Sequence, residues 1–257
     1  MTRAARRVYN HNEVIFCAGG IRKLFDAVLF DLDGTLTGSA EGILNTVEHT
    51  LRETGRPLPD REELKRFIGP PLTYSYEKVC GLTDKREIAR LIDLYHERYD
   101  RIGWRENYVY PLIAPMLKEL KRRGTYLAVV SAKPLPFVKR ILDWFAIGRL
   151  FDCVRAFGMD NVTESKAELL RSALPEGMDP SRAAMVGDRM YDLDAAREAG
   201  AVPVGALYGY GTREDLEEHG ARFIARDTAE LSRDLLGSVP RGAFLTFEGS
   251  DGCWKST

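Results

Sequence analysis

Cysteine and histidine are scarce in this sequence of 257 residues, which has four of each. The cysteines are widely scattered, at positions 17, 80, 153 and 253, so neither a paired metal-ligand spacing nor a dense disulfide framework is expected. None of the histidines has the spacing of a metal site. These absences favour a reducing, cytoplasmic setting.

Long apolar runs and an excess of one charge are also absent. No stretch approaches the roughly 18 to 20 apolar residues of a membrane span, and the apolar run near the start is too short for a signal peptide. The 37 basic and 38 acidic residues give a net charge of −1. No overall field therefore attracts nucleic acid or an anionic membrane, and any anionic ligand must be bound locally.

Four short apolar segments alternate with amphipathic helical stretches. Segments 27–33, 126–132, 183–188 and 202–208 are almost continuously apolar, which is typical of parallel strands buried on both faces. We therefore expect an α/β fold whose core is a doubly wound, Rossmann-like parallel sheet.

The expected domain organisation follows from an interruption of this alternation. Residues 37–108 contain helical stretches but no convincing strand, so we predict an α-helical cap inserted into a catalytic core formed by 25–36 and 109–237. Residues 1–24 are interpreted as a flexible lead-in, with a basic, phosphate-attracting arm as the alternative. An insertion after the first strand lies beside the strand ends where open α/β sheets bind ligands.

The first predicted strand ends in two aspartates, Asp31 and Asp33, within the segment FDLDGTLT. The turn at Gly34 can redirect the second carboxylate, so that both reach one ligand. Two acids near a buried strand end are costly unless a cation neutralises them, and oxygen ligands favour Mg²⁺. The alternative is that both aspartates only cap a turn.

The segment FDLDGTLT resembles the motif of the haloacid dehalogenase superfamily. In its phosphatases the first aspartate attacks phosphorus and the second protonates the leaving group, which implies these roles for Asp31 and Asp33. The resemblance further implies that Gly34 and Thr35 bind the phosphate. The expected activity is that of a Mg²⁺-dependent phosphatase acting through an aspartyl phosphate on a small phosphorylated metabolite or nucleotide.

Two later residues match the phosphate-binding positions of this superfamily. Ser131 ends the strand YLAVVSA, and by resemblance its hydroxyl donates to a phosphoryl oxygen, although a serine there can also be a plain turn residue. Lys166 lies near the start of a predicted helix, where the helix dipole disfavours a cation. By resemblance it holds the nucleophile and the transferring phosphoryl group, and the alternative is a solvated surface lysine.

A second acidic motif, GDRMYDLD, follows the strand that ends at Asp188. It resembles the metal motif of the same superfamily, which implies that Asp31, Asp33 and Asp188 bind Mg²⁺. Asp192 is then expected to support the metal or its water ligands.

The nearest resemblance within the superfamily is to phosphoglycolate phosphatase-like enzymes with a helical cap, on the stretches RFIGPPL, SAKP and LYGYGTREDL. It implies that Gly69 and Pro70 contact the substrate from the cap, although the prolines of this stretch can also form a rigid connector. A 5′-nucleotidase or a pyrophosphatase of the same family is the alternative.

The final residues, 238–257, resemble the opening strand and phosphate loop of a thymidylate kinase. In the loop pattern Trp254 occupies a position that should be glycine, and no kinase body follows it. We interpret this tail as a truncated fusion, with a chance match as the alternative. A Mg²⁺ and phosphate-binding protein without activity, and a truncated nucleotide kinase fusion, remain as more remote hypotheses for the whole chain.

Overall fold

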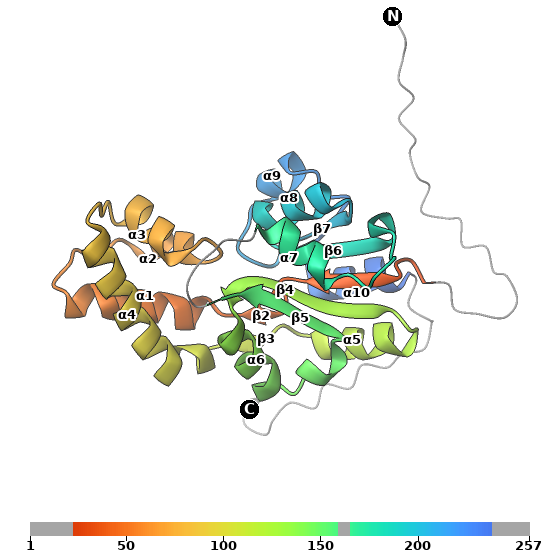
Figure 1. The fold of residues 1–257 in the computed structure, drawn as a ribbon, viewed down its shortest axis with the longest axis horizontal. Coiled ribbons are helices and arrows are strands. Elements are labelled where there is room, and N and C mark those ends of the chain that lie inside the picture. Colours follow the sequence, from red (N-terminus) through yellow and green to blue (C-terminus); the bar gives the residue numbers. More distant parts are fainter. Residues whose placement is uncertain (1–22, 159–164, 238–257) are drawn as a thin grey trace, which may run out of the picture.

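The centre of the protein is a six-stranded parallel sheet with the order β5-β4-β1-β6-β7-β8 (Figure 1). The computed structural model describes residues 23–158 and 165–237. The strands are β1 (Ala27–Phe30), β4 (Tyr126–Pro134), β5 (Cys153–Phe157), β6 (Ala183–Gly187), β7 (Val202–Ala206) and β8 (Phe223–Ala225). The predicted α/β fold with a parallel sheet is thereby confirmed.

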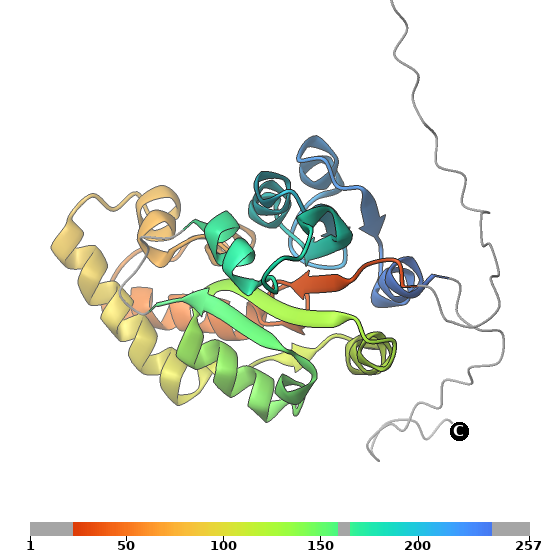
Figure 2. The ribbon, with the colours of Figure 1, turned by 45° about the vertical axis from the view of Figure 1, so that its right-hand side comes forward.

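The sheet lies between two layers of helices, as its almost continuously apolar strands require. Alternate side chains of a strand face opposite sides, and in β1 Val28 and Phe30 join one buried cluster while Ala27 and Leu29 join the other. The first cluster is covered by α5 (Ile113–Arg122), α6 (Leu135–Trp144) and α10 (Thr228–Leu236); the second is covered by α7 (Lys166–Ala173) and α8 (Met190–Ala199) (Figure 2). The short helix α9 (Arg213–Glu218) follows β7.

The helical insertion lies between β1 and α5 and consists of the segments from β2 to β3. It contains β2 (Thr37–Gly38), α1 (Ala40–Glu53), α2 (Arg61–Leu64), α3 (Leu72–Val79), α4 (Lys85–Arg101) and β3 (Tyr108–Val109). Because β2 pairs antiparallel with β3, the chain leaves and re-enters the core at one place. The helices lie at one end of the sheet (Figure 1). The exact domain boundaries stay a prediction.

Local signals explain where several of these helices begin. Asp60 accepts a hydrogen bond from the backbone N–H of Glu63, and Asp84 accepts one from that of Arg86, so both aspartates cap helix starts as expected. Gly124 and Gly200 follow α5 and α8 with positive φ, as helix-ending glycines often do.

The prediction missed the strands β5 and β8, which form the two edges of the sheet. Exposed Arg155 interrupts the apolar pattern of β5, and β8 has only three residues. The lead-in up to residue 22 and the kinase-like tail at 238–257 lie outside the described residues. Among the helices of the described ranges, none is long and apolar enough to cross a membrane.

Candidate active site

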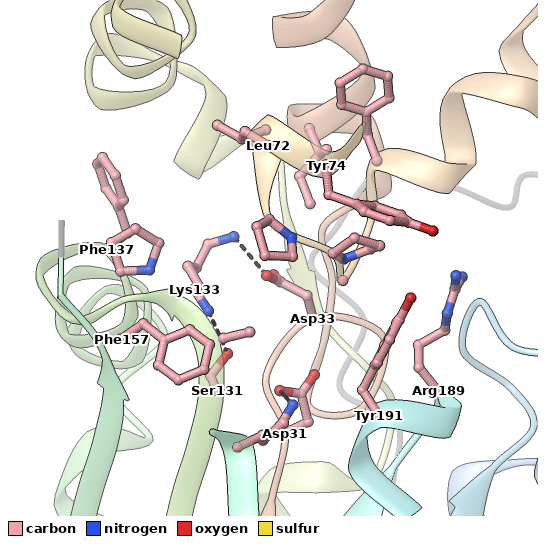
Figure 3. Close-up of a pocket in the computed structure, with 18 of the residues that line it drawn as sticks. Asp31, Asp33, Leu72, Tyr74, Ser131, Lys133, Phe137, Phe157, Arg189 and Tyr191 are labelled. Carbon is pink, nitrogen blue, oxygen red and sulfur yellow. Dashed lines mark hydrogen bonds and ion pairs between the residues drawn. The ribbon is translucent and has the colours of Figure 1, made fainter. Parts of the chain in front are cut away.

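A cavity of about 540 Å³ opens where the carboxyl ends of β1, β4 and β6 face the helical insertion (Figure 3). Polar side chains of the core line its floor: Asp31, Asp33, Ser131, Lys133, Lys166, Asp188 and Asp192. Parallel strands present their carboxyl ends on one edge of the sheet, which is why residues far apart in sequence meet here.

Asp31 directly follows β1 and is held by Lys166. The Lys166 ammonium lies 2.8 Å from Asp31 Oδ1, and it also forms an ion pair with Asp192. A reciprocal cap fixes the start of α7, since the Ser165 hydroxyl accepts from the Glu168 N–H while the Glu168 carboxylate accepts from the Ser165 N–H. This hydrogen-bonded helix start fixes Lys166 in the first turn of α7, where the helix dipole disfavours a cation. The carboxylates of Asp31 and Asp192 stabilise its charge there.

Asp31, Asp188 and Asp192 form a buried acidic cluster. Each offers a carboxylate oxygen, and these oxygens lie within 4.8 Å of one another. Asp188 Oδ2 accepts a 2.7 Å hydrogen bond from the backbone N–H of Tyr210, whereas its buried Oδ1 has no hydrogen-bond partner in the described part of the chain. A buried, unpartnered carboxylate oxygen in an all-oxygen donor set fits a hard divalent cation such as Mg²⁺.

This cluster differs from the predicted metal set in one member. The sequence prediction named Asp33 as a ligand and gave Asp192 a supporting role, but the structure brings Asp192 to the cluster and turns Asp33 toward Lys133 (Figure 3). The reason is local: Asp192 lies in the first turn of α8, and its Oδ2 accepts a 3.1 Å hydrogen bond from the Arg189 N–H.

Lys133 is a residue whose contacts the sequence prediction missed. Its ammonium lies 2.6 Å from Asp33 Oδ2 and 4.8 Å from the ring centroid of Tyr99, on α4 of the helical insertion. The two paired side chains are only 7% and 12% exposed. Its position two residues after Ser131 was the available signal, because alternate residues of a strand face the same side.

Of the predicted phosphate-binding residues Ser131, Gly34 and Thr35, only Ser131 is among the described residues that line the cavity. Ser131 is buried, lines the cavity and accepts a 3.3 Å hydrogen bond from the Lys133 N–H. Gly34 and Thr35 are not among the described lining residues, and their N–H groups donate to Thr37 and Leu32 within the turn after β1. Gly34 and Thr35 therefore lie in the same turn as Asp33.

Burial shapes the charge of the site. It raises the pKa of Asp31 to about 7, against the opposing effect of Lys166, and together with the neighbouring carboxylates it raises the pKa of Asp188 well above its usual value. Burial disfavours the charge of Lys166, but Asp192 and Asp31 outweigh this and raise its pKa. With all groups ionised, the four carboxylates exceed the two lysines by two negative charges, which a divalent cation would offset.

The turn after β1 and the loop after β7 both pack closely against Asp188. A Cβ atom at Gly34 would lie 2.1 Å from Asp188 Oδ2, and one at Gly209 would lie 2.3 Å from Asp188 Cβ. The chain can approach Asp188 this closely only because both positions are glycine. This supporting role of the stretch that contains Gly209 and Tyr210 was not predicted.

The helical insertion contributes the opposite wall. The predicted residues Gly69 and Pro70 line the cavity, and Gly69 has a φ of +105° that favours glycine. Most other residues on the upper walls are apolar or aromatic, and the sequence prediction did not identify them: Phe67, Leu72, Tyr74, Tyr95, Tyr99, Phe137, Phe157 and Tyr191.

Known proteins are similar to this chain over the whole range that contains these site residues. The family model described as haloacid dehalogenase-like hydrolase matches residues 28–206. A 5′-nucleotidase from Pseudomonas aeruginosa is 36% identical over 209 residues, covering 81% of this chain and 94% of that protein. Tyrosine-protein kinase PtkA from Mycobacterium tuberculosis is 34% identical over 212 residues, covering 82% and 72%.

Further similarity is found in a phosphatase and in a solved structure. A phosphoglycolate phosphatase from Pseudomonas putida is 29% identical over 226 residues, covering 83% of this chain and 78% of that protein. The crystal structure of a predicted phosphatase from Clostridium acetobutylicum has a TM-score of 0.77 at 35% identity, covering 83% of this chain and 99% of that one. The matched range 28–206 includes every member of the acidic cluster.

Proposed function

Because this chain belongs to the haloacid dehalogenase-like hydrolase family and is a phosphoric monoester hydrolase, we propose that it cleaves small phosphomonoesters with Mg²⁺ through a phosphoryl group carried on Asp31. The resemblance predicted from FDLDGTLT to this family is confirmed by the same comparisons. A cytoplasmic location is part of the proposal.

The observation that carries the proposal is the meeting of three carboxylates and one lysine at the cavity floor. Asp31, Asp188 and Asp192 offer oxygens within 4.8 Å of one another, and Lys166 contacts Asp31. These carboxylates would hold Mg²⁺, which when bound offsets their charge and polarises a phosphoryl group. A carboxylate nucleophile otherwise repels the anionic ester that it must attack.

The chain's own residues then account for both halves of the reaction. Asp31 forms a bond to phosphorus while the bond from phosphorus to the leaving oxygen breaks, and that oxygen takes a proton from Asp33, which must be protonated before this step although it pairs with Lys133 in the resting site. Asp33 next takes a proton from water as this water attacks phosphorus, which breaks the bond to Asp31 and releases inorganic phosphate. Lys166 and Ser131 stabilise the charge on the transferring group.

Within this activity, phosphoglycolate is the substrate predicted from the sequence, and a 5′-nucleotidase or pyrophosphatase activity is the alternative. The 5′-nucleotidase and phosphoglycolate phosphatase names of two relatives support one substrate class each. Neither substrate is favoured by the residues of the cavity floor, which contact only the phosphate in this proposal.

Phosphate release from an ester panel, with Mg²⁺ and with chelator, tests the proposal. We expect release with Mg²⁺ only, and a loss of at least about 10³-fold in Asp31→Asn, because the amide is a poor nucleophile. Asp194→Asn is the control for an Asp-to-Asn change, since Asp194 lies on α8, is exposed and pairs with His219. Undiminished turnover by Asp31→Asn would refute the assignment.

A further inference from the structure

Aromatic rings surround the part of the cavity above the acidic cluster. They come from separate elements: Tyr74 on α3, Tyr95 and Tyr99 on α4, Phe137 on α6, Phe157 on β5 and Tyr191 on α8. In Figure 3, Phe137 and Phe157 stand on one side, and Tyr74 and Tyr191 stand on the other. The space in which the leaving group of a bound ester must lie is thus walled by rings.

Two of these rings are unusually exposed. Tyr74 is 47% and Tyr191 37% exposed, whereas Phe137, Tyr95 and Tyr99 are buried. Packing within the protein accounts for the buried rings. The exposed pair at the mouth of the cavity, next to buried apolar walls, is the arrangement expected where a ligand covers apolar surface.

The two lysines that line this space are already engaged in ion pairs. Lys133 pairs with Asp33, and Lys166 pairs with Asp31 and Asp192. Burial lowers the pKa of His96, which favours its neutral form. A second anionic group on the substrate would therefore find these partners occupied, and an unpaired charge is costly in an apolar pocket.

Arg189 is a cation at the mouth of the cavity and supports the opposite interpretation, a leaving group with a negative charge. It lines the mouth beside Tyr191, and one of its N–H groups donates to the Tyr210 carbonyl at 3.3 Å. In the described part of the chain no ion pair joins its guanidinium to a carboxylate, although its positive charge acts on Asp188. If Arg189 bound a substrate carboxylate, phosphoglycolate would be preferred, and an Arg189 variant would lose that preference.

We propose that the leaving group of the substrate is uncharged and carries an aromatic ring, which stacks between the two aromatic walls. The ring can belong to a nucleoside or to an aryl or arylalkyl alcohol. Aromatic pairs gain free energy beyond their buried area when they stack offset or meet edge to face. This inference rests on the proposed phosphatase function, since it places the phosphate at Asp31 and the leaving group above it.

The test compares kcat/KM for esters that differ only in the ring. Benzyl phosphate and cyclohexylmethyl phosphate have similar leaving oxygens and sizes, and adenosine monophosphate is compared with ribose phosphate, both esterified at the 5′ oxygen. We expect the aromatic member of a pair to be favoured about tenfold, with phosphoglycolate below the favoured ester. A preference for adenosine monophosphate alone identifies a nucleoside, and one for benzyl phosphate alone identifies a simple aromatic alcohol.

Variants connect the preference to the walls. Tyr74→Leu and Tyr191→Leu replace the two exposed rings by an apolar side chain, so each should bring the benzyl-to-cyclohexylmethyl ratio toward one. Trp144→Leu is the control, because Trp144 is an exposed ring that does not line the cavity. Thermal unfolding of each variant shows whether it has folded.

Several outcomes would overturn the inference. Equal kcat/KM within both pairs, or phosphoglycolate as the best ester with a selective loss in Arg189→Gln, would contradict an aromatic, uncharged leaving group. Hydrolysis of no ester in the panel would instead contradict the proposed function itself.

Discussion

The pairing of Asp33 with Lys133 is a long-range contact at the scale of single residues. It joins positions one hundred residues apart, and both side chains are nearly buried. The ammonium also lies over the Tyr99 ring, so one cation contacts both the core and the helical insertion. Asp33 is thereby held above Asp31, on the side from which the leaving group of our proposal would accept a proton.

Removing this cation should destabilise the protein. Lys133→Met leaves the Asp33 carboxylate buried without its partner, which we expect to lower the free energy of unfolding by about 3 to 5 kcal/mol. Lys121→Met is the control, because the pair of Lys121 with Asp152 is more exposed and is worth about 1 kcal/mol or less. Urea unfolding measures both values.

A second substitution separates charge from packing in that result. Adding Asp33→Asn to Lys133→Met should restore part of the lost stability, because the unpaired charge is gone. If the double variant is no more stable than Lys133→Met, the unpaired carboxylate is not the cause.

Sequence reasoning found the residues that follow strands, and the resemblance implied the contact of Lys166 with Asp31, but the ion pair of Asp33 with Lys133 was missed. Asp31, Ser131 and Asp188 were predictable because each ends an apolar run, and the structure brings all three to one cavity. The partner of Asp33 was not predictable, because an ion pair depends on how two distant strands are placed. Asp192 joins the acidic cluster for a local reason, its position in the first turn of α8, and Asp33 as a metal ligand stays a prediction.

At the scale of elements, the turns after β1 and β7 pack closely against the Asp188 side chain. Gly34, with a φ of +90°, belongs to the first turn, and Gly209 belongs to the second. The carboxylate is therefore positioned by backbone on two sides. Among the described residues, the hydrogen bond to this carboxylate comes from the Tyr210 N–H of the second turn.

Crowding of this carboxylate should weaken Mg²⁺ binding. In Gly34→Ala the new Cβ would clash with Asp188 Oδ2, so we expect at least about a tenfold loss of Mg²⁺ affinity by calorimetry, one tenfold step being about 1.4 kcal/mol. Gly177→Ala is matched for backbone strain, with a φ of +75°, but has no heavy atom within 4 Å of its Cβ.

The two variants should both lose stability from strain, on the order of 1 kcal/mol. Only Gly34→Ala should lose Mg²⁺ affinity. Gly209→Ala provides a second test without a left-handed backbone, because its Cβ would also meet Asp188. Unchanged affinity in both site variants would show that these turns do not position the carboxylate.

The elements themselves were predicted best where the apolar pattern is continuous. The central strands β1 and β6 are fully buried and were found from their runs of apolar residues. The edge strands β5 and β8 were missed, because an edge strand is partly exposed and its sequence carries polar residues or is short. The pair β2 and β3 has two residues per strand, too few for any periodicity.

At the scale of the whole molecule, the acidic cluster couples folding to pH and to metal. The pKa of Asp31 is about 7 in the folded protein against 3.8 ordinarily. Between these values the folded state binds a proton that the unfolded state has released, so its stability falls as the pH rises. A bound cation would favour the carboxylate form and reduce this penalty.

We therefore expect the metal-free protein to lose stability from about pH 4 to pH 7, and then to level off as far as Asp31 is concerned. His96 acts in the opposite sense below its ordinary pKa of 6.5, because burial lowers its pKa. The readout is thus the difference in unfolding free energy between the parent protein and Asp31→Asn across this range, with chelator and with Mg²⁺.

That difference should change with pH in chelator and less so with Mg²⁺. A difference that stays constant from pH 4 to pH 7 in chelator would show that Asp31 does not carry the shifted pKa. Asp194→Asn should follow the parent protein, because its side chain is exposed.

Identification of the phosphorylated residue tests the central claim most directly. The enzyme is mixed with Mg²⁺ and its best ester, quenched with acid during turnover, and digested for mass spectrometry. We predict a phosphoryl group on Asp31 in the parent protein and in Asp194→Asn, and none in Asp31→Asn. Turnover with the phosphoryl group on another residue, or undiminished turnover by Asp31→Asn, would contradict the account.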